Sequence, residues 1–143
     1  MTEVHFYTGV ADKTLHACRL VRQAIERGRK VVAYASDHQA LARFDTALWT
    51  FDPISFVPHA MLGDPLAERT PVVLTTVSDT DNDGLSHHEV LFNLDGETPR
   101  FFSRFDLLIE FVGLEADDVA AGRARWKFYA ERGYRMHHRP QDA

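Results

Sequence analysis

The segment Lys-Val-Val-Ala-Tyr-Ala-Ser at residues 30–36 decides the fold class. Its five consecutive apolar residues suit a strand that is covered on both faces, as in the parallel sheets of α/β proteins. Ser36 follows directly and Gln39 stands three residues later, a capping-box spacing that predicts a helix from Ser36 to about Trp49. A buried strand followed by a helix is the repeating unit of an α/β fold.

The preceding segment shows the same alternation. Residues 4–8 read as a strand, and Asp12 can cap a helix whose apolar side chains between Thr14 and Ile25 fall on one stripe. Gly28 is expected to end that helix.

The following segments complete the alternation. Three further strands and a final helix are predicted at residues 72–77, 89–94, 106–112 and 116–132. Gly133 is expected to stop the helix, and no repeat or change in composition marks a second domain. The sequence predicts an α/β fold, a single three-layer domain over residues 1–143 with a mostly parallel, Rossmann-like central sheet.

The composition describes an acidic chain of ordinary domain size. Its 143 residues are 45% hydrophobic, with a formal net charge of −5 and a pI near 5.9. Such a chain lacks the excess of Lys and Arg that binds nucleic acid tightly, so any action on DNA should pass through another protein. The apolar runs are far shorter than the roughly 20 residues of a membrane span. The single cysteine cannot form an intramolecular disulfide, and no positively charged N-terminus followed by an apolar run indicates secretion. We therefore expect a cytoplasmic protein.

Motifs for catalysis are missing from the sequence. The turn at residues 8–12 holds one glycine and matches no glycine-rich pattern that cradles phosphates. Cys18 falls on the apolar stripe of its helix, where a thiol is unreactive. No serine stands in a nucleophile elbow, and no pair of carboxylates stands out. We therefore expect neither a cofactor nor enzyme activity.

Two patterns that could bind metal favour plainer interpretations. Residues 79–84 repeat the first half of a calcium loop, but Val90 stands where a bidentate Glu belongs and Glu89 falls one short. A solvated acidic loop fits better. The pairs His87-His88 and His137-His138 would point to opposite faces of a strand and have no partners at zinc-site spacing, so we expect surface histidines and no metal.

Two alternative function classes stay open on residue patterns alone. A small α/β enzyme could use Asp37, His38 and His59 near strand ends, where such sheets bind ligands. A calcium-responsive module could use the acidic segment 79–89.

Residues 48–59 gather large aromatic side chains around a proline turn. Phe51 is expected to fold back over the core. Trp49, Phe56 and Val57 could instead form an exposed apolar patch, which would indicate contact with another protein.

The C-terminal region concentrates positive charge. Residues 122–139 hold six Arg or Lys residues against one acid, although the whole chain carries −5. On a helix Arg123, Trp126 and Lys127 share one face, which suits an acidic peptide with an apolar end; a solvated cationic face is the alternative. A neighbouring row is expected to pack inward, consisting of Ala120, Ala124 and Phe128.

Several segments, in consistent order over essentially the whole chain, resemble the chi subunit of bacterial DNA polymerase III. They are Phe6-Tyr7, Asp45-x-x-Leu48-Trp49, Ser55-Phe56-Val57-Pro58-His59, Val90-Leu91-Phe92-Asn93-Leu94, Arg123-x-x-Trp126-Lys127-x-Tyr129 and Gly133-Tyr134. The Leu-Trp and Ser-Phe-Val-Pro-His pieces are fairly specific at this spacing.

The resemblance implies a non-catalytic adaptor of the clamp-loader assembly in DNA replication, without nucleotide chemistry. It implies that the psi subunit, or another replication or repair protein, binds at Trp49, Phe56 and Val57. It also implies a pocket for the acidic, Phe-terminated tail of single-stranded DNA-binding protein. That pocket falls on Val112, Arg123, Trp126 and Lys127.

Two positions depart from the family pattern. Trp126 stands where a tyrosine is common, and Val119 stands where a basic residue is common, so both bear on the affinity for the tail. Arg123 can still take a terminal carboxylate bidentately, and Lys127 can act as a point charge. Trp126 and Val112 are expected to cover the terminal phenyl ring.

Overall fold

The computed structural model describes residues 1–54, 56–76 and 85–141. Its helices are α1 (Lys13–Glu26), α2 (His38–Thr50) and α3 (Ala116–Glu131), with 3-10 turns at Ala67–Arg69 and Phe102–Arg104. Its strands are β1 (Glu3–Thr8), β2 (Val31–Tyr34), β3 (His59–Met61), β4 (Val72–Thr75), β5 (Val90–Asn93), β6 (Leu107–Phe111) and β7 (Arg135–Pro140). Among the helices so described, none has the length and apolar character to cross a membrane.

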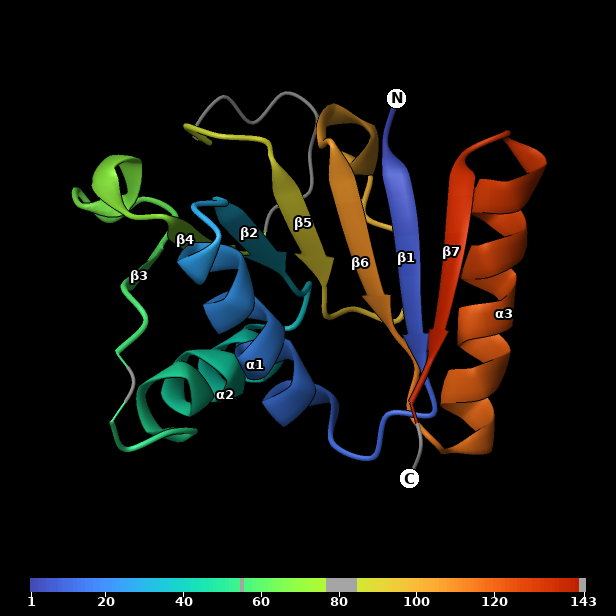
Figure 1. The fold of residues 1–143 in the computed structure, drawn as a ribbon, viewed down its shortest axis with the longest axis horizontal. Coiled ribbons are helices and arrows are strands. Elements are labelled where there is room, and N and C mark those ends of the chain that lie inside the picture. The colour runs from blue at the N-terminus through green and yellow to red at the C-terminus, as the bar shows by residue number, and fades with distance from the viewer. Residues whose placement is uncertain (55, 77–84, 142–143) are drawn as a thin grey trace.

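The seven strands of the described residues form one sheet in the order β3-β4-β2-β5-β6-β1-β7. All neighbouring pairs are parallel. Figure 1 shows α1 in front of the strands, α2 below them at lower left and α3 beside β7 at the far end of the sheet. The predicted α/β class is confirmed, with a sheet that is parallel throughout these strands.

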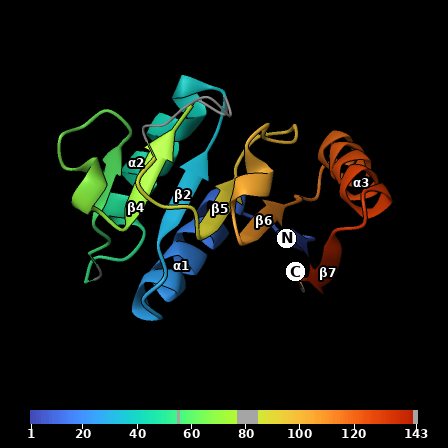
Figure 2. The same ribbon diagram turned by 90° about the horizontal axis from the view of Figure 1, so that it is seen from above.

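Alternate residues of each strand pack on opposite faces of the sheet. On β2, Val31 and Ala33 belong to the hydrophobic cluster that includes α1 and α2, whereas Val32 and Tyr34 belong to the cluster that includes Tyr129 of α3. Figure 2 shows α1 and α3 on opposite sides of the sheet. Because both faces are covered, the strand reads as a continuous apolar run instead of an alternating one.

The helix starts agree only partly with the prediction. Asp12 caps α1 through its side chain, as expected. The cap of α2 is Asp37, whose Oδ1 accepts a hydrogen bond from the Gln39 N–H at 3.0 Å, so the predicted cap at Ser36 is wrong. The Ser36 hydroxyl instead donates to Asp95 Oδ1 at 2.7 Å, a partner distant in the chain that the local pattern does not reveal.

The two edge strands were missed by the sequence reasoning. β3 has three residues, too few for a periodic pattern. β7 reads Arg-Met-His-His-Arg-Pro and is mostly exposed or half-buried. An edge strand has one neighbour and little buried surface, so it lacks the apolar signal of a central strand.

The inward face of α3 also differs from the prediction. Ala120 and Ala124 are exposed, and of the expected inward row only Phe128 packs against the core. The buried residues of the helix are Gly122, Arg125 and Tyr129. An arginine on the buried side was not foreseen because its type indicates a surface position.

Arg125 is buried because it belongs to a polar network around Glu110 of β6. Glu110 is 0% exposed, and its carboxylate accepts hydrogen bonds from Arg125 Nε at 3.0 Å, the Tyr129 hydroxyl at 2.6 Å and Asn93 Nδ2 at 2.9 Å. Burial raises the pKa of the Glu110 carboxyl, while Arg125 and the other two donors oppose that rise. The network joins α3 to β5 and β6 inside the core.

Loss of the Arg125 guanidinium would leave the Glu110 carboxylate buried without its cation. We expect Arg125→Ala to lower the free energy of unfolding by about 3–5 kcal/mol, because removing one partner of a buried pair is strongly destabilising. Urea denaturation at pH 7 measures this change. Arg123→Ala on the exposed side of the same helix is the control and should change it by less than about 0.5 kcal/mol. Equal effects of the two substitutions would contradict the role given to the network.

Candidate functional site

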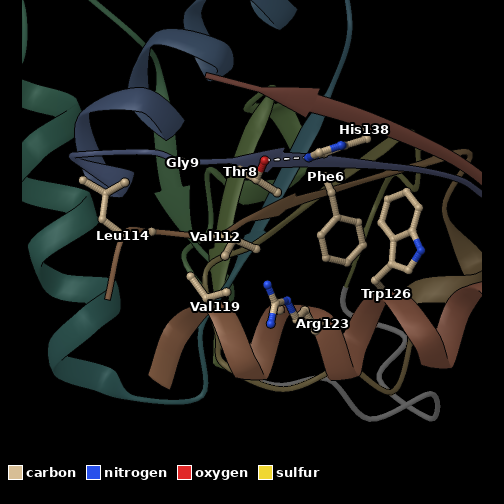
Figure 3. Close-up of a pocket in the computed structure, with 11 residues that line it drawn as sticks. Phe6, Thr8, Gly9, Val112, Leu114, Val119, Arg123, Trp126 and His138 are labelled. Carbon is tan, nitrogen blue, oxygen red and sulfur yellow. Dashed lines mark hydrogen bonds between the residues drawn. The ribbon is translucent and has the colours of Figure 1, made fainter. Parts of the chain in front are cut away.

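A cavity of about 420 Å³ lies where the carboxyl end of β1 and the turn after β6 meet α3 and the end of β7. Figure 3 shows side chains from β1, α3, β7 and the turn after β6 around it. We call this cavity the α3 pocket. It is lined by Phe6, Thr8, Gly9, Val112, Gly113, Leu114, Val119, Gly122, Arg123, Trp126 and His138.

An aromatic wall closes one side of the α3 pocket. The Trp126 ring packs edge-on against Phe6 with centroids 5.2 Å apart, and against His138 with centroids 6.0 Å apart. His138 Nε2 lies 2.6 Å from the Thr8 hydroxyl, which connects β7 to β1 at the rim (Figure 3). Residues from α3, β1 and β7 therefore build the wall together.

α3 packs very closely against Val112 at Gly122. A Cβ placed on Gly122 would lie 2.5 Å from Val112 Cγ2, closer than atoms can pack. The helix can therefore reach this depth only with glycine at the position, and Val112 fills the space under it. This contact sets the width of the α3 pocket.

The turn between β6 and α3 is held by Asp118. Its Oδ2 accepts hydrogen bonds from the Gly113 N–H at 2.6 Å and from Lys13 Nζ at 2.9 Å. Although burial works to raise the pKa of Asp118, the Gly113 N–H and the Lys13 ammonium hold it below its usual value. Because Gly113 and Leu114 line the α3 pocket, this anchoring fixes one side of its mouth.

Three of the four residues predicted for tail binding line the same pocket. Val112 lies under α3, and Trp126 forms the aromatic wall. Arg123 is exposed and also lines the pocket (Figure 3). Lys127 does not line the pocket; its side chain is 76% exposed and its Nζ lies 3.8 Å from Glu131 Oε1. Val119, noted as a departure from the family pattern, is a lining residue.

A second candidate surface lies around the end of α2 and the start of β3. Trp49 is 53% exposed, Phe56 is 67% exposed, and their ring centroids are 5.4 Å apart. The His59 ring lies 4.7 Å from the Trp49 ring. We call these three residues the Trp49 patch. Val57 is only 2% exposed, so its predicted exposure is wrong and it belongs to the core below the patch.

Phe51 behaves as expected, since it is half-buried and packs against the core cluster of α1 and α2.

The residues of the alternative enzyme site are not brought together. The strand register aligns His59 with Val72, and Val72 with Val31, which places His59 at the amino-terminal edge of the sheet. Asp37 and His38 follow the carboxyl end of β2 and lie at the opposite edge. These three residues cannot form one catalytic site in this fold.

Other residues considered from the sequence have structural explanations. Cys18 is buried, and burial raises the pKa of its thiol to about 12, which confirms an unreactive cysteine. His87 is 8% exposed, so the expected surface position is wrong for this residue. The carboxylates at positions 79, 81 and 83 lie outside the described residues.

Sequence reasoning missed Thr8 and His138 as parts of the pocket. His138 belongs to β7, the edge strand that carries no apolar pattern. The alternation of buried Val4 and Phe6 in β1 could have placed Thr8 on the same face, because residues two apart on a strand share a face.

Comparison with known proteins identifies similar chains of one kind. The family model described as "DNA polymerase III chi subunit, HolC" matches residues 1–137. The DNA polymerase III subunit chi of Pseudomonas aeruginosa is 34% identical over 138 residues, covering 94% of this chain and 93% of the relative. That of Haemophilus influenzae is 33% identical over 113 residues, covering 78% and 74%, and that of Escherichia coli is 25% identical over 119 residues, covering 83% and 79%.

A solved structure shows the same fold without close sequence similarity. It is the C-terminal domain of S. cerevisiae Dbp5 bound to Gle1 and IP6, with a TM-score of 0.62 and 13% identity over 99% of this chain and 92% of that one. At this identity the likeness concerns the fold alone.

The tight contact at the base of the α3 pocket gives a specific prediction. Gly122→Ala should lower the free energy of unfolding by about 1–3 kcal/mol, because the new methyl group overlaps Val112 and forces α3 outward. In a Val112→Ala background the same substitution should cost about 0.5–2 kcal/mol less, since the overlap is gone. Chemical denaturation of the four proteins measures both values. Gly96→Ala, where no atom lies within 4 Å of the new Cβ, is the control; fully additive losses would contradict the overlap.

Proposed function

The chain belongs to the DNA polymerase III chi subunit family, and on that premise we propose that it links the polymerase to two partner proteins within the clamp-loader assembly. It is an accessory subunit of DNA replication and has no catalytic role of its own. One partner is the acidic C-terminal tail of single-stranded DNA-binding protein, which binds in the α3 pocket. The other is the psi subunit, or another replication or repair protein, which binds at the Trp49 patch.

The observation that carries the tail assignment is an apolar pocket with a cation at its lining. Phe6, Val112 and Trp126 offer hydrophobic contact, and the exposed guanidinium of Arg123 adjoins them. A ligand that matches both features has an apolar end group next to a carboxylate. A chain that ends in phenylalanine carries these two groups on one residue, because its terminal carboxylate is attached to the carbon that bears the phenyl side chain.

The expected affinity follows from these two contacts. Burial of one phenyl ring contributes about 2–3 kcal/mol, and an ion pair at an exposed arginine adds less than about 1 kcal/mol. After the cost of ordering a flexible tail, the complex should dissociate in the micromolar range. Salt should weaken it, because the exposed charges are screened.

Charges around the α3 pocket modify this affinity. Lys127 is exposed on the helical turn after Arg123, where its ammonium can attract the acidic residues that precede the terminal phenylalanine. Val119 extends the apolar lining at a position where the family often has a cation. Tail binding by this chain should therefore depend more on apolar burial and less on charge than binding by relatives with the basic residue.

The Trp49 patch supports the second partner. The Trp49 and Phe56 rings are more than half exposed and pack against each other. They form an exposed apolar surface of the kind that marks protein contacts. Aromatic side chains of this kind are the residues that most often dominate protein interfaces. Val57 contributes from below by supporting the patch, not by touching the partner.

The tail assignment is tested by fluorescence anisotropy with a labelled acidic peptide that ends in Pro-Phe. Trp126→Ala should weaken binding at least about 10-fold because it removes the aromatic wall, and Arg123→Ala should weaken it by about 3–5-fold because it removes an exposed ion pair. Removal of the terminal phenylalanine should abolish binding. Arg19→Ala, which removes an exposed cation from α1, is the control. A double variant at 123 and 126 that binds like the unmodified chain would remove the α3 pocket as the site.

The partner assignment is tested by calorimetry with purified psi. Simultaneous Trp49→Ala and Phe56→Ala should weaken psi binding by at least about 30-fold, the usual effect of losing central aromatic contacts. Tail-peptide binding should stay unchanged. Leu66→Ala, another exposed apolar residue, serves as the control. Unaltered psi affinity in the double variant would place the psi interface elsewhere.

A further inference from the structure

We propose that Glu3, His5 and His137 form a binding site for Zn²⁺ or a similar transition-metal ion on the face of the sheet opposite α3. The three side chains come from the first and the last strand of the chain. Their ligand atoms all lie within 4.8 Å of one another.

Strand pairing places these side chains together. β1 and β7 are parallel neighbours, and their register sets His5 directly beside His137. Glu3 precedes His5 by two residues and shares its face, while Phe6 and His138 point to the opposite face and line the α3 pocket. Figure 1 shows β1 and β7 side by side at one end of the sheet, with α1 and α2 over the other half.

The distances suit one tetrahedral ion. Glu3 Oε1 lies 2.7 Å from His137 Nε2 and 3.8 Å from His5 Nε2. Ligands at about 2.0–2.1 Å from a tetrahedral zinc lie about 3.3 Å apart, and the two measured separations fall on either side of this value. The two imidazole rings are stacked with centroids 4.4 Å apart, so both rings must tilt from this arrangement for their in-plane lone pairs to converge on one ion.

The chemistry of the three groups fits a borderline-soft cation. Two imidazoles and a carboxylate form a known three-ligand zinc set, which leaves the fourth position for water. The Glu3 side chain is 43% exposed and that of His137 is 36% exposed, so solvent can reach the ion.

Arg139 opposes metal binding and provides a sharp test. Its Nε donates a hydrogen bond to His5 Nδ1 at 3.0 Å, so the neutral ring carries its proton on Nε2, the atom that faces Glu3. A metal needs the lone pair of that Nε2. Arg139 is exposed and can move away, which lets the proton sit on Nδ1. Arg139 therefore lowers the affinity, and its removal should raise it.

An ion at this position would cross-link β7 to β1. β7 pairs only with β1 among the described strands, and it carries His138 on the rim of the α3 pocket. The metal would thus hold the edge strand that completes the pocket.

Calorimetric titration of the full chain with ZnCl₂ in metal-free buffer tests the proposal. We expect one ion per chain with micromolar affinity. His5→Ala and His137→Ala should each weaken binding at least about 100-fold, because each removes a direct ligand and the loss of an outer-shell group alone costs about 10–100-fold. Arg139→Gln should strengthen it several-fold. His38→Gln removes an exposed histidine at the start of α2 and should change nothing.

Two titration results would overturn the site. One is a wild-type chain without saturable binding up to millimolar zinc. The other is binding that survives in the His5→Ala, His137→Ala double variant, provided that circular dichroism shows the fold intact. Amide NMR signals recorded with paramagnetic Co²⁺ should broaden around β1 and β7; broadening centred elsewhere would also contradict the proposal.

Discussion

The burial of the Glu110 carboxylate is the constraint that the arrangement of α3 depends on. A carboxylate with no exposed surface is costly unless cations and donors surround it, and here they come from α3 and β5. The Arg125 guanidinium also donates to the Gly96 and Phe111 carbonyls at 2.7 and 3.3 Å, so it is held from several sides. Since these partners fit in one position of the helix, α3 docks with Gly122 over Val112 and Trp126 beside Phe6. The α3 pocket is thus a consequence of the core beneath it.

The architecture keeps the two proposed surfaces apart. The Trp49 patch lies at the start of β3, which is one edge strand of the sheet. The α3 pocket is rimmed by β7, which is the other edge strand. α2 and α3 also belong to hydrophobic clusters on opposite faces. A parallel sheet covered on both faces is rigid, so a partner at one edge need not disturb the other. Such a layout suits a subunit that acts by holding two proteins at once.

Sequence reasoning recovered the interior and missed the edges. The central strands were predictable because burial on both faces leaves a continuous apolar run such as residues 31–35, and α1 was predictable from Asp12 and its apolar stripe. β7 could not be predicted because an edge strand of arginines and histidines has no apolar period. Arg125 looked like one of several surface cations, because nothing local reveals that Glu110 lies behind it. For the α3 pocket, the resemblance supplied Val112, Arg123 and Trp126. Thr8 follows from the alternation along β1, whereas His138 required the pairing of β1 with β7.

The central claim, that the two surfaces act independently, is tested most directly by tail-peptide anisotropy measured with the chain alone and with the chain saturated with psi. Separate surfaces at opposite edges predict the same dissociation constant within about twofold, because binding at one site leaves the other unchanged. They also predict a higher final anisotropy with psi present, since the peptide then tumbles with a larger complex. Displacement of the peptide by psi would contradict the claim and indicate that the partners compete for one surface.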